Sequence, residues 1–178
     1  ISKMVRRYGL EPIVHAVGWH DGKDSFQRSL NRLVGLIDVL SKRSDTVSII
    51  GISAGGSAAL NAFCVRKEKV HSVISICARL LTGPLRGYRS FQSKTASSFA
   101  FAQSVKMFEQ REKALRVSDR QKIMTVRALF GDELVPSETA IVDGAYNTTV
   151  PTPEYLFSIG MSLTFFSRPL LMFLSRTH

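Results

Sequence analysis

The sequence predicts an α/β fold, a single domain in which helices cover both faces of a mostly parallel sheet. Near-continuous apolar runs at 46–52, 70–77 and 123–130 are typical of strands that are buried on both faces. Segments with helical spacing of apolar residues separate these runs, as in βαβ units. The 178 residues are enough for one such domain with a sizeable core.

The first half of the chain alternates between helix and strand. Residues 2–9 predict a short helix, and residues 12–18 (PIVHAVG) predict a strand. After a polar turn, Ser25 is placed to cap a helix. The apolar residues at helical spacing in that helix are Phe26, Leu30, Leu33, Val34, Ile37 and Leu40. A strand at 46–52 follows, and then a helix that runs to about Val65.

The second half repeats the alternation around a longer insertion. A strand at 70–77 leads into residues 80–95, which are rich in Gly, Pro, Ser and Arg and predict a loop. Residues 98–115 predict an amphipathic helix. A strand at 123–130 and a short extended piece at 147–152 then precede the C-terminal segment.

That C-terminal segment, 156–174 (LFSIGMSLTFFSRPLLMFL), invites comparison with a membrane span, which needs roughly 20 apolar residues. Arg168 and Pro169 interrupt it, and proline disfavours helical geometry in the residue before it. We therefore expect a buried helix with a break at this point.

The net charge indicates which partners the protein could bind, and the cysteine positions indicate the state of its thiols. The net charge of +10 allows nucleic acid or an anionic membrane surface as a partner. Because Lys and Arg are spread along the chain, a generally basic surface is favoured over a nucleic-acid site, and peripheral membrane contact stays an alternative. Cys64 and Cys77 lie in apolar segments without metal-ligand spacing. We expect free thiols, a cytoplasmic location, and neither metal nor cofactor.

The motif GISAGG at 51–56 lies at the carboxyl end of a predicted strand, where parallel sheets place their ligands. Gly-x-Ser-x-Gly between a strand and a helix is typical of a nucleophile elbow, with Ser53 on a strained turn and Gly51 and Gly55 avoiding collisions. The amide of Ala54 would then face a developing oxyanion. The alternative is a glycine-rich turn that grips a phosphate, but neither phosphate-loop pattern is present.

The elbow VSIIGISAGGSAALNAF, the strand VHSVISIC, the segment ALFGDELVPSE and the apolar tail together resemble the α/β-hydrolase family. The resemblance runs from about residue 12 to the end of the chain. It implies an eight-stranded, mostly parallel sheet, a catalytic order Ser…Asp…His, and a lid-like insertion at about 80–115. It assigns Ser53 as the nucleophile and Asp132 as the acid that orients the base. Glu133 is the fallback acid, and a simple turn residue is the alternative for Asp132.

The chain departs from the family where the catalytic histidine is expected. Tyr155 occupies the histidine position, and Glu154 occupies that of a glycine. A phenol with an unperturbed pKa of about 10 is mostly protonated at neutral pH, and a solvated carboxylate with a pKa near ~4.3 is a feeble base.

Another histidine would have to replace the missing base. His20 alone follows the carboxyl end of a predicted strand, so it is the alternative base if its loop bends; otherwise it is a solvated turn residue. His15 lies inside a predicted strand, His71 lies near the start of one, and His178 would be roughly 30 Å along a helix from Tyr155.

The family also places earlier strands before the helix that opens this chain, and one of them neighbours the elbow strand. The loop after that strand usually supplies a second oxyanion amide. We expect sequence upstream of Ile1 to provide these strands, because loss of a central strand would leave backbone groups unpaired.

These observations predict a serine hydrolase that acts on carboxylic esters through an acyl-enzyme on Ser53. A small-molecule ester or acyl compound is the expected partner. The alternative is a hydrolase-fold binding or scaffold protein, a pseudoenzyme that has lost its base at Tyr155.

Overall fold

The computed structural model describes residues 6, 8–19, 25–44, 46–83, 90–96, 98–129, 135–151, 155–164 and 167–176. Within these residues one parallel sheet forms, with its strands in the order β1-β2-β3-β4. The strands are β1 (Val47–Ile52), β2 (Val70–Ile76), β3 (Ile123–Ala128) and β4 (Tyr146–Val150). The order along the chain and the order in space coincide, which confirms the predicted α/β fold.

The register brings the carboxyl ends of the strands to one edge of the sheet. Ile52 pairs with Ile76 at the end of β1 and β2, and Ile76 pairs with Val126 on β3. Ala128 pairs with Val150 at the end of β3 and β4. The segments that follow all the strands therefore start from the same side of the molecule, where open parallel sheets bind their ligands.

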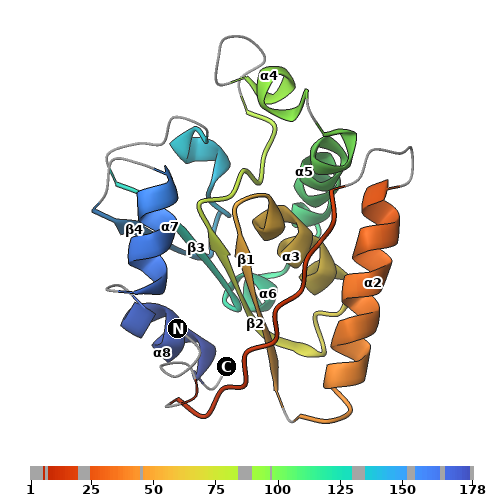
Figure 1. The fold of residues 1–178 in the computed structure, drawn as a ribbon, viewed down its shortest axis with the longest axis vertical. Coiled ribbons are helices and arrows are strands. Elements are labelled where there is room, and N and C mark those ends of the chain that lie inside the picture. The colour runs from red at the N-terminus through yellow and green to blue at the C-terminus, as the bar shows by residue number, and fades with distance from the viewer. Residues whose placement is uncertain are drawn as a thin grey trace.

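Helices lie on both faces of the sheet (Figure 1). One face carries α2 (Ser25–Leu40) and α3 (Ala54–Val65), with α5 (Phe99–Glu112) packed against both helices. The other face carries α7 (Tyr155–Leu163) and α8 (Ser167–Leu174). The short helices are α4 (Phe91–Thr95), α6 (Val117–Arg120) and η1 (Ser137–Thr139), a 3₁₀ turn.

Each face of the sheet has its own apolar core. On the α2–α3 side, Phe26, Leu60, Phe63 and Phe108 have no exposed surface. On the α7–α8 side, the buried cluster includes Ile74, Ile76 and Phe173. Burial on both faces explains why β2 and β3 read as near-continuous apolar runs in the sequence.

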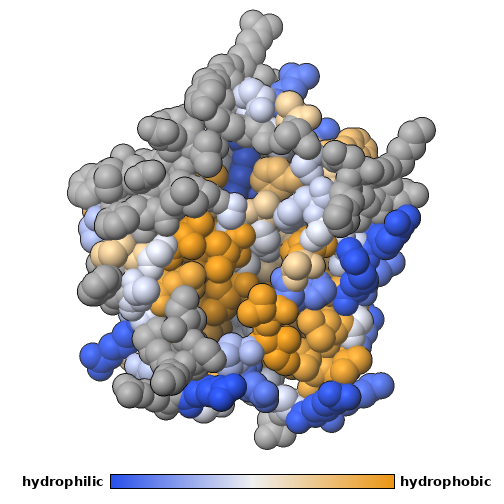
Figure 2. Space-filling model, viewed as in Figure 1, coloured by the Kyte–Doolittle hydropathy of each residue, from blue (hydrophilic) through white to orange (hydrophobic). Residues whose placement is uncertain are grey.

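The predicted strand at 12–18 is wrong, because residues 10–19 pair with no strand in the described part of the chain. Leu10 packs against the core beside α8, whereas Val17 and Trp19 pack against the core beside α2. The segment therefore passes from one face of the sheet to the other, and Figure 1 shows it running past β1. Val14 is 98% exposed in this segment. Figure 2 shows apolar surface on the same side of the molecule.

Two further boundaries differ from the prediction. The C-terminal segment does break into two helices, but the break lies between Leu163 and Ser167. Pro169 lies in the first turn of α8, where a missing amide proton costs no helical hydrogen bond. The predicted loop 80–95 ends in helix α4, which is capped by Ser90. Most of the predicted helix 2–9 lies outside the described residues.

Among the described residues, no helix is both long and apolar enough to cross a membrane.

Candidate active site at the carboxyl edge of the sheet

Ser53 stands at the turn between β1 and α3 in a backbone conformation that side chains rarely adopt. Its φ is 55° and its ψ is −130°. Its amide donates to the carbonyl of Ile76 on β2 at 2.9 Å, and its carbonyl accepts from the amide of Gly56 at 2.9 Å. A non-glycine residue in this region is strained, and the strain persists only where the surroundings hold it. These two hydrogen bonds fix the Ser53 backbone from both sides.

The hydroxyl of Ser53 is not used to cap the helix that it precedes. Serine at an N-cap ordinarily accepts a hydrogen bond from an amide of the first turn, from an extended backbone. Ser53 makes no side-chain cap hydrogen bond, and its side chain is half-buried rather than enclosed. The next amide, that of Ala54, has no hydrogen-bond partner within the described residues. It lies at the positive end of the α3 dipole, as an oxyanion donor would.

The packing of the elbow accounts for Gly51 by collision but not for Gly55. A Cβ atom on Gly51 would lie 2.5 Å from the carbonyl oxygen of Gly55 and 2.6 Å from the Cα of Gly56. A Cβ atom on Gly55 would meet nothing within 4 Å, so collision does not explain that glycine. Gly56 is the second glycine that packing requires, since a Cβ there would lie 2.3 Å from the Cβ of Ala78.

The predicted acid and the alternative base fall outside the described residues. This holds for Asp132, Glu133, Glu154, His20 and His178.

Tyr155 is the first residue of α7, which follows the carboxyl end of β4. The structure therefore puts the backbone of Tyr155 on the same edge of the sheet as Ser53. It does not describe the Tyr155 side chain. Ser53 and Tyr155 belong to segments that follow β1 and β4, with β2 and β3 between them.

Neither of the two described histidines follows the carboxyl end of a strand. His71 lies near the start of β2, and its Nε2 donates to the backbone carbonyl of Arg176 at 2.6 Å. It is therefore held at the amino end of the sheet, as the sequence predicts. His15 is exposed in the segment that runs past β1.

Arg79 is a buried charge at this edge that the sequence analysis did not single out. It is 2% exposed, and its Nη2 donates to the carbonyl of Thr82 at 2.6 Å. Burial lowers the pKa of its guanidinium, while the nearby charge of Glu138 raises it. The guanidinium also lies 5.5 Å from the ring centroid of Phe91. Its sequence signal is an arginine inside the apolar run ICARLL.

The segments that follow β2 and β3 are joined to each other. The amide of Leu80 donates to the carbonyl of Thr139 at 2.7 Å, and the amide of Leu81 donates to the same oxygen at 3.2 Å. A Cβ atom on Gly83 would lie 2.3 Å from the Cγ2 of Thr139, at a φ of +61°. The chain downstream of Asp132 is thus anchored beside the end of β2.

Cys64 is half-buried and Cys77 is buried, and neither forms a disulfide within the described residues. Burial raises the pKa of Cys64 to about 11, so this thiol is neutral at physiological pH. Cys77 is buried directly after β2, with a positive φ of 48°, and its amide donates to the carbonyl of Val126 at 2.8 Å. No group of three or more His, Cys, Asp or Glu side chains in the described ranges could hold a metal ion.

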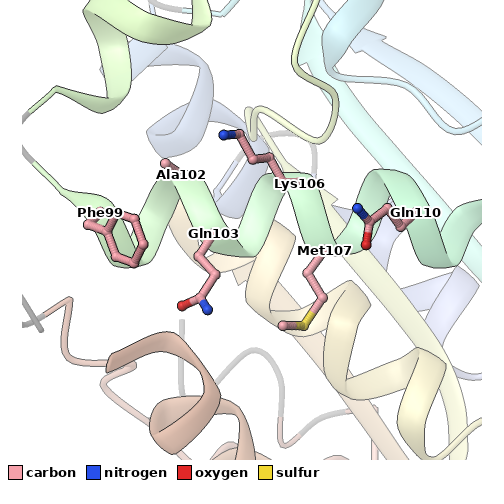
Figure 3. Close-up of a pocket in the computed structure, with 6 residues that line it drawn as sticks. All are labelled: Phe99, Ala102, Gln103, Lys106, Met107 and Gln110. Carbon is pink, nitrogen blue, oxygen red and sulfur yellow. The ribbon is translucent and has the colours of Figure 1, made fainter. Parts of the chain in front are cut away.

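A pocket of 310 Å³ lies on α5 and not at the elbow (Figure 3). Its lining residues are Phe99, Ala102, Gln103, Lys106, Met107 and Gln110. Figure 3 shows Gln103 and Met107 on one side of the helix and Lys106 on another. The Oε1 atom of Gln103 is buried without a hydrogen-bond partner in the part of the chain that the structure describes. None of these residues belongs to a strand end or to α3.

The fold and the elbow define a parallel α/β protein with a strained serine at a strand–helix turn. No protein-family model matches the chain, and no curated protein matches its sequence. Among solved structures, a monoacylglycerol lipase from Paleococcus ferrophilus is similar over 82% of this chain and 74% of that chain, with 12% sequence identity and a TM-score of 0.49. We draw no functional conclusion from a likeness this distant.

Proposed function

We propose that this chain is an α/β-hydrolase-fold domain in which Ser53 is a nucleophile toward carboxylic esters. The observation that carries the proposal is the Ser53 backbone, at φ 55° and ψ −130°, with a hydroxyl that does not cap α3. A serine that served only to begin a helix would adopt an extended backbone and accept a hydrogen bond from the first turn. Backbone strain at a serine between a strand and a helix is typical of a nucleophile elbow.

The proposed reaction takes place at Ser53, at the carboxyl ends of the strands, and proceeds through an acyl-enzyme. The Ser53 hydroxyl attacks the ester carbonyl carbon and gives its proton to a base, while the carbonyl oxygen becomes an oxyanion facing the Ala54 amide. The tetrahedral adduct expels the alcohol, which takes up the proton, and the acyl group remains on Ser53. Water then attacks the acyl-enzyme, releases the carboxylic acid and restores the serine hydroxyl.

At the family's histidine position, the proposed site has no residue that is well suited to act as the base. Asp132 is the proposed orienting acid, and Tyr155 stands where the family has its histidine. A phenol is a poor proton acceptor near neutrality, where a histidine would be well matched. His20 is the alternative base.

A second candidate function is a hydrolase-fold binding protein without turnover. The observation in its favour is the position of the two described histidines. His71 is held at the amino end of the sheet by the carbonyl of Arg176, and His15 is exposed. With Tyr155 in the place of the base, the elbow would then hold an acyl or ester compound without hydrolysing it.

A fluorophosphonate probe tests the nucleophile directly, because it reacts covalently with activated serines. We expect labelling of Ser53 in the intact chain and its loss in Ser53→Ala. The matched control is Ser41→Ala, which removes a serine hydroxyl at the end of α2 and should leave labelling unchanged. Absence of labelling at high protein concentration would contradict the enzyme proposal and favour the binding protein.

Restoring an imidazole tests the base. We expect Tyr155→His to raise the rate of Ser53 labelling and of ester turnover by at least tenfold, since general-base catalysis contributes about 10²–10⁴-fold. The control is Tyr146→His, which puts an imidazole at the start of β4, at the opposite edge of the sheet. Equal rates in both variants would mean that position 155 does not face Ser53.

A further inference from the structure

Helix α5 is joined to the elbow helix α3 by a buried polar network. The Oγ of Ser57 on α3 and the Oγ of Ser104 on α5 lie 2.7 Å apart. The Nδ2 of Asn61 donates to the backbone carbonyls of Ser57 and Ser104, at 2.8 Å in each case. Arg111 donates to the Oδ1 of Asn61 at 3.1 Å. Ser57, Asn61 and Ser104 have no exposed surface, so water cannot replace these bonds without opening the interface.

The two serine hydroxyls make more contacts than they have protons. The Oγ of Ser57 also lies 3.0 Å from the carbonyl of Ala54, and the Oγ of Ser104 lies 2.8 Å from the carbonyl of Phe101. Each of the three contacts needs one hydroxyl proton, and the pair supplies two. Because two hydroxyl oxygens 2.7 Å apart repel unless one donates to the other, two arrangements follow: Ser104 donates to Ser57 and Ser57 donates to Ala54, or Ser57 donates to Ser104 and Ser104 donates to Phe101.

In the first arrangement, the chain of hydrogen bonds ends at the carbonyl of Ala54, which belongs to the elbow. Ala54 follows the strained Ser53, and its peptide groups form the first turn of α3. A strained residue keeps its conformation only where neighbouring contacts over-determine it. The Ser104–Ser57–Ala54 chain is one such contact, and it comes from an element about fifty positions away in the sequence.

We propose that Ser104 is a positioning residue for the elbow: through Ser57 it holds the first turn of α3, and with it the Ser53 backbone and the Ala54 amide. This inference rests on the proposed function for its catalytic meaning. If Ser104 has this role, α5 stays in place beside the elbow. The family resemblance, in contrast, puts this helix inside a lid-like insertion. The face of α5 that carries Ser104 contacts α3, while the residues in Figure 3 line the pocket on that helix.

The test compares Ser104→Ala with Ser29→Ala. Ser29, on α2, is also a buried serine, and its hydroxyl donates to the carbonyl of Gly18 at 3.2 Å rather than to a group of α3. Hydrogen exchange of the amides at 54–57 is measured in both variants, above all at Gly56, whose amide donates to the Ser53 carbonyl, with the amides of β3 as a reference for global opening. We expect exchange at 54–57 to rise roughly fivefold in Ser104→Ala alone, the change that loss of one net hydrogen bond produces. Ser104→Cys keeps a weak donor at the γ position and should show a smaller rise.

Labelling of Ser53 by the fluorophosphonate probe is the second readout. We expect it to slow in Ser104→Ala and to stay unchanged in Ser29→Ala. If the wild-type chain is not labelled, the proposed function fails, and exchange at 54–57 still decides the positioning role because it needs no chemistry. Equal exchange at 54–57 in the two variants, or a rise that β3 shares in full, would overturn the inference.

Discussion

The two sides of β1 are built in opposite ways. On the inner side Gly51 is buried so closely against α3 that a single methyl group would collide with backbone atoms. Ile50 and Ile52 are 39% and 38% exposed, although they belong to the same strand. The Ser53 amide donates to the Ile76 carbonyl on β2. Backbone N–H and C=O groups of successive residues in a strand point to alternate sides, so those of Ile50 and Ile52 point away from β2, toward the outer edge of the sheet. Within the described residues, no strand pairs with that edge.

This difference shows where the molecule can hold strain. The φ of 55° at Ser53 is held by contacts from β2 and α3 on the inner side of β1. Among the described residues, the segment 10–19 runs past the outer edge without pairing with it, and residues 11–16 of that segment are all exposed. Substitutions on the inner side should therefore change stability strongly, and substitutions on the outer side weakly.

The largest expected effect comes from Gly51→Ala. The added methyl group would lie 2.5 Å from the carbonyl oxygen of Gly55 and 2.6 Å from the Cα of Gly56, and backbone atoms cannot step aside as a flexible side chain can. We expect a loss of about 3 kcal/mol in the free energy of unfolding, at the upper end of typical overpacking costs. Urea denaturation, with the slope checked for two-state behaviour, measures it.

Gly55→Ala is the matched control, since a methyl group there meets open space. In a helix, alanine is favoured over glycine, so we expect a change between zero and a gain of about 1 kcal/mol. Equal destabilisation by the two substitutions would mean that the elbow is sensitive to any added side chain, and the contrast between the two glycines would fail.

Ser53→Gly should stabilise the fold while removing the proposed nucleophile. Strain at a residue such as Ser53 costs about 1–3 kcal/mol, and glycine relieves it at an entropic cost of about 0.4–1 kcal/mol. We expect a net gain of about 1 kcal/mol, which raises the Tm by roughly 2–4 °C in a domain of this size. Calorimetry of Ser53→Gly beside Ser53→Ala measures it, because alanine removes the hydroxyl but keeps the strain. A Tm no higher for glycine than for alanine would contradict the strain.

The same contrast explains what the sequence could and could not predict. Gly51 follows from the local motif, because the atoms that crowd it belong to Gly55, Gly56 and Ala59, a few residues along the chain. A small residue at Gly56 is expected from the need for α3 to pack close to the sheet, but the atoms that crowd it belong to Ser75 and Ala78, at the end of another strand, which the local motif does not specify.

Residues 12–18 have the composition of a strand, but a strand needs a neighbour to pair with, and composition cannot supply one. The α7–α8 break was placed too late because Pro169 was taken as its cause. A proline in the first turn of a helix is compatible with that helix and does not end it.

The smallest expected effect is on the outer edge of β1. Ile52→Val removes one methylene from a side chain that is 38% exposed, and Ile76→Val removes the same group from its register partner, which has no exposed surface. Burial of a methylene is worth about 0.8 kcal/mol, and loss from a close-packed core adds a cavity cost. We expect about 1 kcal/mol for Ile76→Val and about 0.3 kcal/mol for Ile52→Val, measured as shifts of the urea midpoint at equal slope. A loss at Ile52 as large as that at Ile76 would show that the outer edge is covered in solution, because only buried surface carries the full cost.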